Sequence, residues 1–210
     1  MQQTEVAAPA AVRPVGMVAI IGRPNVGKST LVNALVGERV SITSRKPQTT
    51  RDRVLGVRTD DDAQYIFVDT PGFQRRHRTA LNRRMNATVT SALVDVDAVV
   101  LVIEAAGWTE GDEQMLPLLP PQSGNVILAI NKSDVLVERE RLLPLMGDSM
   151  RRYPFRAIVP VSAEKSRQLD DLLKEIRPLL PEGMPLFDAD QYTDRSVRFL
   201  AAESVREKAY

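Results

Sequence analysis

Residues Gly22–Thr30 read Gly-Arg-Pro-Asn-Val-Gly-Lys-Ser-Thr, which has the spacing G-x-x-x-x-G-K-[ST] of a phosphate-binding loop. Glycines let successive backbone N–H groups converge on one point, because no Cβ stands in the way. A polyphosphate fits such a nest at the start of a helix. Lys28 then reaches the outer phosphates, and the Ser29 hydroxyl is placed to bind the Mg²⁺ that bridges them. The alternative, a chance glycine-rich turn, is disfavoured by the strand-like run before the motif and the helix-like run after it.

A second motif, Asp69-Thr-Pro-Gly-Phe73, directly follows an expected strand at residues 65–68. A carboxylate at the end of a buried strand faces the crevice in which open α/β sheets bind ligands. Asp69 can therefore hold the magnesium ion through a water. Gly72 has no side chain, so its amide can approach a γ-phosphate and sense whether that phosphate is present. The motif at this distance from Lys28 predicts a nucleotide-dependent switch.

The polar segment between the two motifs, residues 38–52, has no helix or strand periodicity. Long loops in compact domains are usually functional or mobile. Thr49 and Thr50 can each supply a second hydroxyl to the metal. A solvated loop is the competing interpretation for its basic side chains. The same holds for the arginine patch at residues 75–84, which we interpret as solvation in preference to an RNA-facing surface.

A third motif, Asn131-Lys-Ser-Asp134, follows an expected strand at residues 126–130. The Asp134 carboxylate can accept hydrogen bonds from both N1–H and the 2-amino group of guanine, whereas adenine offers no such donor pair. An unpaired buried carboxylate is costly, so the site should reject adenine. The Lys132 stem can lie along the base ring, and Asn131 can tie this loop to the phosphate-binding loop. A backbone N–H in the segment 162–165 can meet guanine O6.

The composition of the chain limits the kinds of partner and metal site that fit the sequence. The chain has 210 residues, 43% of them hydrophobic, and a formal net charge of +1, so bulk charge favours no particular partner. It has no cysteine and one histidine, which excludes disulfides and thiolate metal sites. No apolar run approaches the roughly 20 residues that span a bilayer.

Strand and helix signals alternate along the chain, as in a sheet covered by helices on both faces. We therefore expect a three-layer α/β P-loop domain with a mostly parallel six-stranded sheet. The expected strands are residues 16–21, 54–58, 65–68, 98–103, 126–130 and 157–161. The expected helices lie near residues 31–36, 81–93, 109–119, 137–152 and 169–176.

Together these motifs resemble the G domain of the Era GTPases, over residues 16 to 187. Pro47-Gln-Thr-Thr-Arg51 and Asp69-Thr-Pro-Gly-Phe73 narrow the resemblance from P-loop GTPases in general to Era; Leu81-Asn-Arg-Arg-Met-Asn86 and Ser162-Ala163 add to it. The resemblance implies slow intrinsic hydrolysis of GTP to GDP and phosphate. It also implies 16S-type small-subunit rRNA as a partner, a role in small-subunit assembly, and a cytoplasmic monomer with peripheral association at the inner face of the cell membrane.

The family pattern also assigns residues to the site. It makes Lys28, Thr50 and Gly72 catalytic, and Ser29, Thr50 and Asp69 the magnesium ligands, while Asn25 matches a residue that helps bind K⁺ in potassium-activated relatives. The expected nucleotide-binding set is Gly22, Arg23, Pro24, Asn25, Val26, Gly27, Lys28, Ser29, Thr30, Asp69, Gly72, Asn131, Lys132, Asp134, Ser162, Ala163 and Glu164.

The resemblance ends before the C-terminal KH domain of Era proteins, which clamps RNA with a G-x-x-G loop. We expect a disordered tail at residues 1–15, the G domain at 16–181, a linker at 182–195 and the opening helix of a missing KH domain at 196–210. The G domain should need nothing after Pro181 to bury its core. This chain alone should bind RNA weakly or not at all.

Two other functions stay open. The first is a P-loop ATPase or small-molecule kinase; the motif Asn131-Lys-Ser-Asp134 argues against it, because this motif should recognise guanine. A module that holds nucleotide without turning it over is kept open by Phe73, which stands where Ras-like proteins carry a water-orienting glutamine. Phe73 cannot position water, so hydrolysis would need the switch backbone, a cation at Asn25 or a partner.

Overall fold

The structure is a computed structural model that describes residues 12–43, 53–73, 80–120 and 124–209. Thr49 and Thr50 lie outside these residues, as does the N-terminal half of the arginine patch. None of the helices among the described residues is long and apolar enough to cross a membrane.

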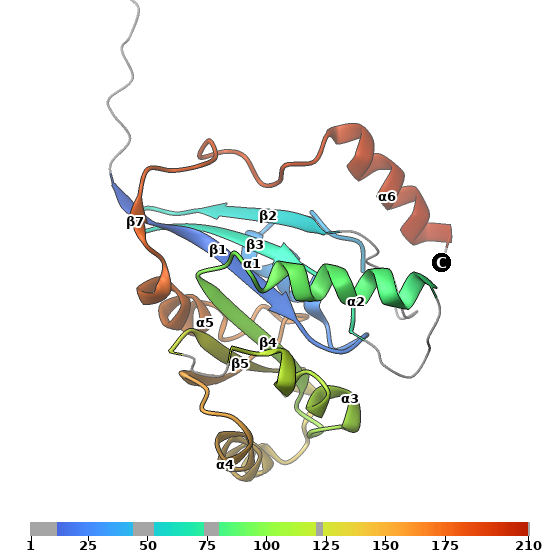
Figure 1. Cartoon of the computed structure of the whole chain (residues 1–210), viewed down its shortest axis with the longest axis vertical. Helices are drawn as coiled ribbons and strands as arrows, with labels where there is room; N and C mark the ends of the chain where they lie inside the picture. The colour runs from blue at the N-terminus through green and yellow to red at the C-terminus, as the bar shows by residue number, and fades with distance from the viewer. Residues whose placement is uncertain (1–11, 44–52, 74–79, 121–123, 210) are drawn as a thin grey trace, which may run out of the picture.

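The elements alternate along the chain as the sequence predicts (Figure 1). The strands are β1 (Arg13–Ile21), β2 (Val54–Thr59), β3 (Gln64–Asp69), β4 (Ala98–Glu104), β5 (Val126–Asn131), β6 (Ala157–Pro160) and β7 (Glu182–Gly183). The α-helices are α1 (Lys28–Val36), α2 (Ala80–Ala92), α3 (Glu110–Glu113), α4 (Leu142–Arg152), α5 (Leu169–Ile176) and α6 (Val197–Ala209). Short 3₁₀ turns lie at Leu116–Leu118, Ser133–Val135, Arg139–Arg141 and Arg177–Leu179.

The sheet has the strand order β2-β3-β1-β4-β5-β6. β2 runs antiparallel to β3, and the other neighbours along this path are parallel. The carboxyl ends of β1, β3, β4 and β5 therefore meet at one edge, which is where this kind of sheet binds ligands. Each predicted motif follows one of these strands or β6.

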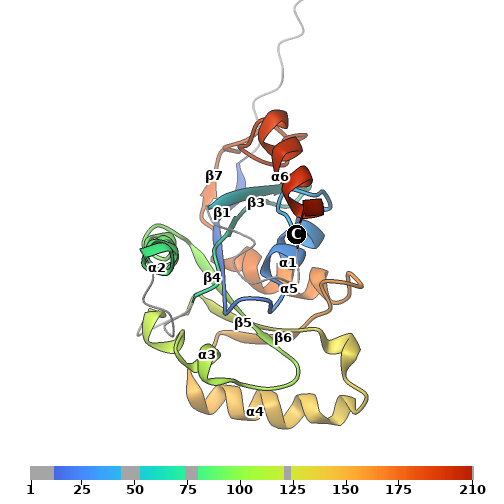
Figure 2. The same cartoon turned by 90° about the vertical axis from the view of Figure 1, so that its right-hand side faces the viewer.

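Helices cover the sheet on both sides, with α2 on one side and α1 and α5 on the other (Figure 2). The buried apolar residues correspondingly form two core clusters. In β4, Val100 and Val102 face the cluster formed with α1 and α5, whereas Leu101 and Ile103 face the cluster that includes α2, the α3 segment and α4. This period of two is what a strand buried on both faces requires. The three-layer α/β fold predicted from the sequence is confirmed.

Three local expectations are corrected. β1 begins at Arg13, not residue 16, because Arg13 and Pro14 pair with a seventh strand, β7, that the sequence did not reveal. The expected helix at residues 109–119 is instead the single turn α3 followed by a 3₁₀ turn. Pro117 explains the break, since proline cannot donate the backbone hydrogen bond that continues an α-helix. Residues 137–141 precede α4 and are not part of it.

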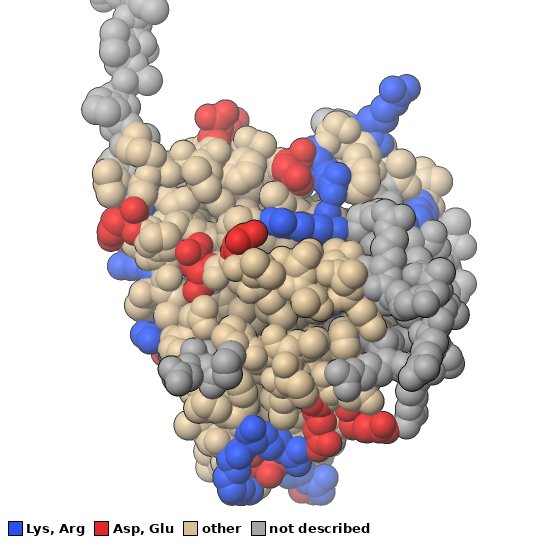
Figure 3. Space-filling view, viewed as in Figure 1, with Lys and Arg blue, Asp and Glu red and all other residues tan. Residues whose placement is uncertain are grey.

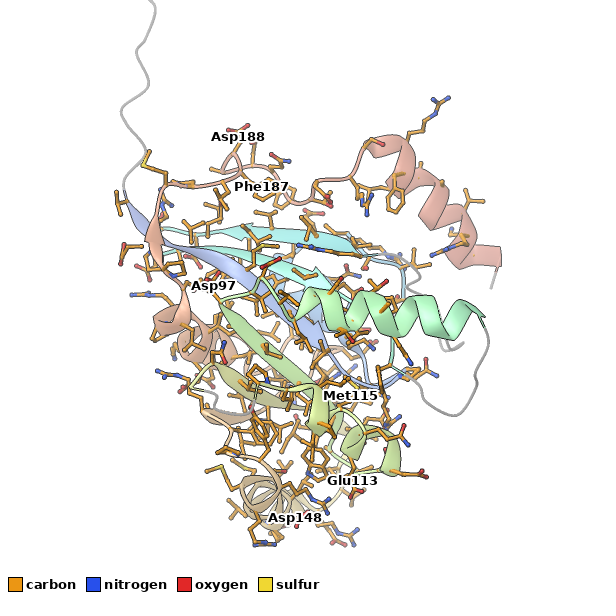
Figure 4. All side chains as sticks on the ribbon, viewed as in Figure 1. Asp97, Glu113, Met115, Asp148, Phe187 and Asp188 are labelled. Carbon is orange, nitrogen blue, oxygen red and sulfur yellow. The ribbon has the colours of Figure 1, made fainter. Side chains whose placement is uncertain are left out.

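The segment after α5 lies against the outer edge of the sheet, where Phe187 is labelled in Figure 4. The Gln64 side chain is fully buried and accepts hydrogen bonds from Leu186 N (2.7 Å) and Phe187 N (3.1 Å). Val57 N donates to Tyr192 O at 2.8 Å. Among the described residues, neither core cluster includes a residue after Leu180, so the expectation that the core needs nothing after Pro181 is not contradicted. The hydrogen bonding of β2 and β3, however, extends to residues 186–192.

Candidate functional site

The phosphate-binding loop turns from β1 into α1 through Gly27, whose φ of 97° is left-handed. A Cβ at Gly27 would also collide with the side-chain amide of Asn131. Only glycine satisfies both restrictions. Lys28 opens α1, and its Nζ donates to the Arg23 carbonyl at 3.0 Å. The loop is thus folded around its own lysine.

Lys28 is buried, with 6% of its surface exposed. Burial lowers the pKa of Lys28 from 10.5 to about 8, although the neighbouring Asp69 opposes this shift. A polyphosphate in the loop would restore a strong preference for the charged lysine, because opposite charges nearby favour the ionised form.

This lowered pKa predicts that nucleotide binding takes up a proton. At pH 8 about half of the Lys28 amines in the free protein are neutral, so GDP binding should take up about half a proton per site. At pH 6.5 Lys28 is already charged and its uptake should fall toward zero. Isothermal titration in buffers of different ionisation enthalpy measures this number. Equal apparent enthalpies in all buffers at pH 8 would show that Lys28 does not titrate on binding.

Asp69 ends β3 and is fully buried. Its Oδ2 accepts a hydrogen bond from the Ser41 hydroxyl at 2.7 Å, and Ser41 in turn is held by Asn33 of α1 through backbone contacts. Ser29 lies one residue after Lys28 at the N-terminus of α1. A buried carboxylate and a hydroxyl next to the phosphate loop are oxygen ligands of the kind that Mg²⁺ prefers. The described residues therefore fit a magnesium ion.

Gly72 lies directly against the phosphate-binding loop. A Cβ on Gly72 would come within 2.7 Å of Pro24, and Phe73 N donates to the Gly22 carbonyl at 3.3 Å. The Phe73 side chain is buried, in the core cluster that also includes Ile21 and Val89. Phe73 is thus a packing residue, and the segment that begins at Gly72 starts from a fixed contact with the loop.

Asn131 connects three segments of the site. Its Nδ2 donates to Val26 O in the phosphate-binding loop at 2.8 Å, and its Oδ1 accepts from Ala163 N at 3.0 Å. Asn131 is 2% exposed, so these bonds are shielded from water. The predicted tie between the base loop and the phosphate loop is present in the structure.

Asp134 projects from the turn after β5, and its Oδ1 accepts a hydrogen bond from the Ser162 hydroxyl at 2.5 Å. That bond lowers the pKa of Asp134, which keeps the carboxylate ionised at neutral pH. Ser162 also accepts from Lys165 N at 3.2 Å. The residues that should read guanine thus lie together, and contact of a 162–165 amide with guanine O6 stays a prediction.

Three acidic or hydroxyl residues that the sequence did not single out also belong to the site. Ser41 orients Asp69, while Glu104 and Asp112 contact Arg23. Each contact joins residues at least 28 positions apart, so no local pattern could have identified it.

The fold and this site define a P-loop protein of the GTPase class, with a phosphate-binding loop, a carboxylate at the end of β3 and a guanine-type loop after β5 at one sheet edge. A family model described as 50S ribosome-binding GTPase matches residues 17–132. The GTPase Era of Bordetella avium (strain 197N) is 58% identical over 195 residues, and that of Nitrosomonas eutropha (strain DSM 101675) is 53% identical. The chain belongs to the Era family of GTPases.

Two solved structures agree with this assignment. A crystal structure of Era in complex with MgGDPNP and nucleotides 1506–1542 of 16S ribosomal RNA is 44% identical, with a TM-score of 0.89 over 94% of this chain and 67% of that one. An Aquifex aeolicus Era variant bound to GDP·AlF4⁻ is 45% identical, with a TM-score of 0.88 over 93% of this chain and 67% of that one. The Bordetella and Nitrosomonas matches cover 93% of this chain but 66% of the relatives.

Proposed function

We propose that this domain is a guanine-nucleotide switch that binds GTP with Mg²⁺ and hydrolyses it slowly to GDP and phosphate. The observation that carries the proposal is the pair of Asn131 bonds to Val26 O and Ala163 N. Through them one buried side chain fixes the loop that holds phosphates relative to the loop that carries Asp134. A nucleotide that reaches both loops has its phosphates at Lys28 and its base at Asp134.

The roles of the residues follow from their positions. Lys28 and the loop amides stabilise the negative charge that moves among the phosphate oxygens. Ser29, Asp69 and Thr50 would hold Mg²⁺, which supplies further positive charge at those oxygens. The Gly72 amide is proposed to detect the γ-phosphate. Because the Phe73 side chain is buried, it does not orient the attacking water.

Two measurements, one of binding and one of phosphate release, separate this proposal from the alternatives. GTP should bind at least 10³-fold more tightly than ATP, since adenine leaves Asp134 without its donors, whereas a P-loop ATPase or kinase would show the opposite order. Phosphate release should follow under single-turnover conditions. A domain that binds GTP tightly and releases no phosphate over hours would be a nucleotide-holding module.

The identity of the monovalent cation should change the rate. Asn25 has a left-handed φ of 66° and lies between Pro24, which contacts Gly72, and Val26, which holds Asn131. A cation at this point would add positive charge near the phosphates, as the family pattern implies. Replacing K⁺ by Na⁺ should therefore slow single-turnover hydrolysis several-fold at equal ionic strength, with GDP affinity nearly unchanged. Equal rates in the two salts would remove the cation at Asn25 from the mechanism.

We further propose that a full-length Era protein with this G domain acts on small-subunit rRNA. The matching family model is described by binding to the 50S ribosome, whereas the Era structure that is 44% identical to this chain contains 16S rRNA. We give the Era structure the greater weight, because it is a match to one individual protein over 94% of this chain. In Figure 3, Lys and Arg side chains gather over α4, but Arg152 there pairs with Asp148 and Glu113. These acidic partners offset the positive charge of Arg152, so the cations over α4 do not by themselves argue for a phosphate-binding patch. Association with the inner face of the cell membrane stays a prediction of the resemblance.

The RNA proposal is tested by comparing this chain with the full-length Bordetella avium relative on the 16S segment 1506–1542. We expect the longer protein to bind at least ten-fold more tightly in gel-shift titrations at matched salt, because salt changes phosphate contacts strongly. Equal affinities would instead assign RNA binding to the G domain, with the arginine patch at residues 75–84 as the surface to mutate next.

A further inference from the structure

Glu104 ends β4 at the sheet edge where the nucleotide loops meet. In the parallel pairing of β4 with β5 it lies opposite Asn131, and Ala105 N donates to the Asn131 carbonyl at 2.8 Å. β1, which leads into the phosphate-binding loop, pairs with the other side of β4. Glu104 therefore stands between the phosphate-binding loop on one side and the base loop on the other.

The two carboxylate oxygens of Glu104 bind cations from these two different loops. Oε2 pairs with Arg23 Nη2 at 3.0 Å, and Oε1 accepts a hydrogen bond from Lys132 Nζ. Lys132 Nζ also donates to the Asn25 carbonyl at 2.9 Å. Burial of Glu104 by itself raises its pKa, but the hydrogen bond from Lys132 and the charge of Arg23 outweigh it, so the pKa lies below 4.5.

Asp112 completes the arrangement on the α3 side. It is fully buried and pairs with Arg23 Nε at 3.3 Å. Thr109 holds Asp112 in place through a backbone N–H (3.0 Å) and a hydroxyl (2.6 Å). Arg23 consequently pairs with two carboxylates, one from β4 and one from α3. A continuous series of polar contacts therefore runs from Asp112 through Arg23, Glu104 and Lys132 to Asn25.

Both loops need such support, because each contains a strained residue. Asn25 and Lys132 have left-handed φ values of 66° and 62° although neither is glycine. Such conformations persist only where surrounding contacts fix them, and they concentrate at ligand sites. The Lys132–Asn25 hydrogen bond joins the two strained residues directly, and Glu104 is the group that neutralises and orients the lysine that makes it.

We propose that Glu104 is a positioning residue that couples base recognition to phosphate recognition. It keeps the Lys132 stem beside the place where a guanine ring would bind and, through Arg23, keeps the phosphate-binding loop in its nested form. The free protein then orders less of its site when nucleotide arrives, which favours slow dissociation. This inference rests on the proposed guanine-nucleotide function of the same site.

The test variant is Glu104→Gln, which keeps the shape of the side chain and removes its charge. We expect a Kd for fluorescent (mant) GDP about ten-fold higher than that of the unmodified chain, mainly through faster dissociation in stopped flow. The melting temperature of the nucleotide-free chain should stay within about 2 °C. The matched control is Glu113→Gln, which removes the same charge and also breaks an ion pair, but one with Arg152 of α4, outside both loops. Its Kd should be unchanged.

A double-mutant cycle separates positioning from general stability. In a Lys132→Met background, whose GDP affinity is already reduced, Glu104→Gln should raise the Kd by less than about three-fold, because its main partner is gone. An undiminished ten-fold effect in that background, or an equal Kd and dissociation rate in Glu104→Gln and the unmodified chain, would overturn the role. So would a large fall in melting temperature that accounts for the lost affinity. If the unmodified chain itself failed to bind GDP, the proposed function would fall instead.

Discussion

Replacing Asp134 by Asn should convert this domain from a guanine to a xanthine nucleotide binder. The carboxylate accepts two hydrogen bonds from guanine, and bonds to a charged acceptor contribute about 1.5–3 kcal/mol each. Asn offers one acceptor and one donor, and its donor faces the guanine 2-amino group. The Kd for GDP should therefore rise about 10²- to 10⁴-fold, and XDP, whose 2-oxo group accepts from the Asn amide, should bind more tightly than GDP.

The substitution is nearly isosteric, which makes the result interpretable. The Ser162 hydroxyl donates to Asp134 Oδ1 at 2.5 Å, and the Asn side-chain oxygen can accept the same bond, so the loop should keep its shape. Asp148→Asn is the control, because Asp148 pairs with Arg151 and Arg152 on α4, which lies outside the nucleotide loops. Unchanged GDP affinity in Asp134→Asn by isothermal titration would show that another group reads the base.

The parts of this site that could be predicted from the sequence are those fixed by local geometry. The phosphate-binding loop needs glycine at position 27 because the backbone there has a left-handed φ. The glycine that meets this requirement can be recognised directly in the sequence. Asp69 and Asn131 each end a strand whose apolar run is also visible. Parallel strands then bring these ends to one edge without further information.

The parts that could not be predicted depend on long-range contacts. Glu104 reads as the polar residue that ends an apolar strand, and nothing nearby indicates that it binds Arg23, 81 positions earlier. Gln64 comes directly before the expected strand at residues 65–68, yet it is fully buried because its partners come from residues 186 and 187. A polar side chain is buried only where partners satisfy it, and those partners are set by tertiary structure.

Removing residues 182–210 should therefore destabilise the domain, whereas removing only residues 196–210 should not. The segment 182–195 pairs with β1 through β7 and hydrogen-bonds the Gln64 side chain, and Thr193 Oγ1 donates to the Leu55 carbonyl at 2.7 Å. Each such bond contributes about 0.5–1.5 kcal/mol net. Loss of these bonds should lower the free energy of unfolding by about 4 kcal/mol in total. For a domain of this size, that corresponds to a fall in melting temperature of roughly 10 °C.

Three chains test this expectation by calorimetry: the whole chain, one ending at Arg195 and one ending at Pro181. The chain ending at Arg195 should melt within about 2 °C of the whole chain and bind GDP equally well. The chain ending at Pro181 keeps every residue of the predicted nucleotide site, so it should still bind GDP below its lowered melting temperature. Equal melting temperatures for all three would show that residues 182–195 add nothing to the stability of the domain.

Gln64→Leu isolates the contact that holds the segment. In the whole chain it removes the acceptor for Leu186 N and Phe187 N and the donor to Phe187 O at 2.8 Å. The free energy of unfolding should therefore fall by about 2–3 kcal/mol. In the chain ending at Pro181 those partners are absent, and the same substitution should have an effect near zero. A similar loss in both chains would mean that Gln64 acts within the sheet, through its bond to Thr59 Oγ1 at 2.8 Å, and does not anchor the C-terminal segment.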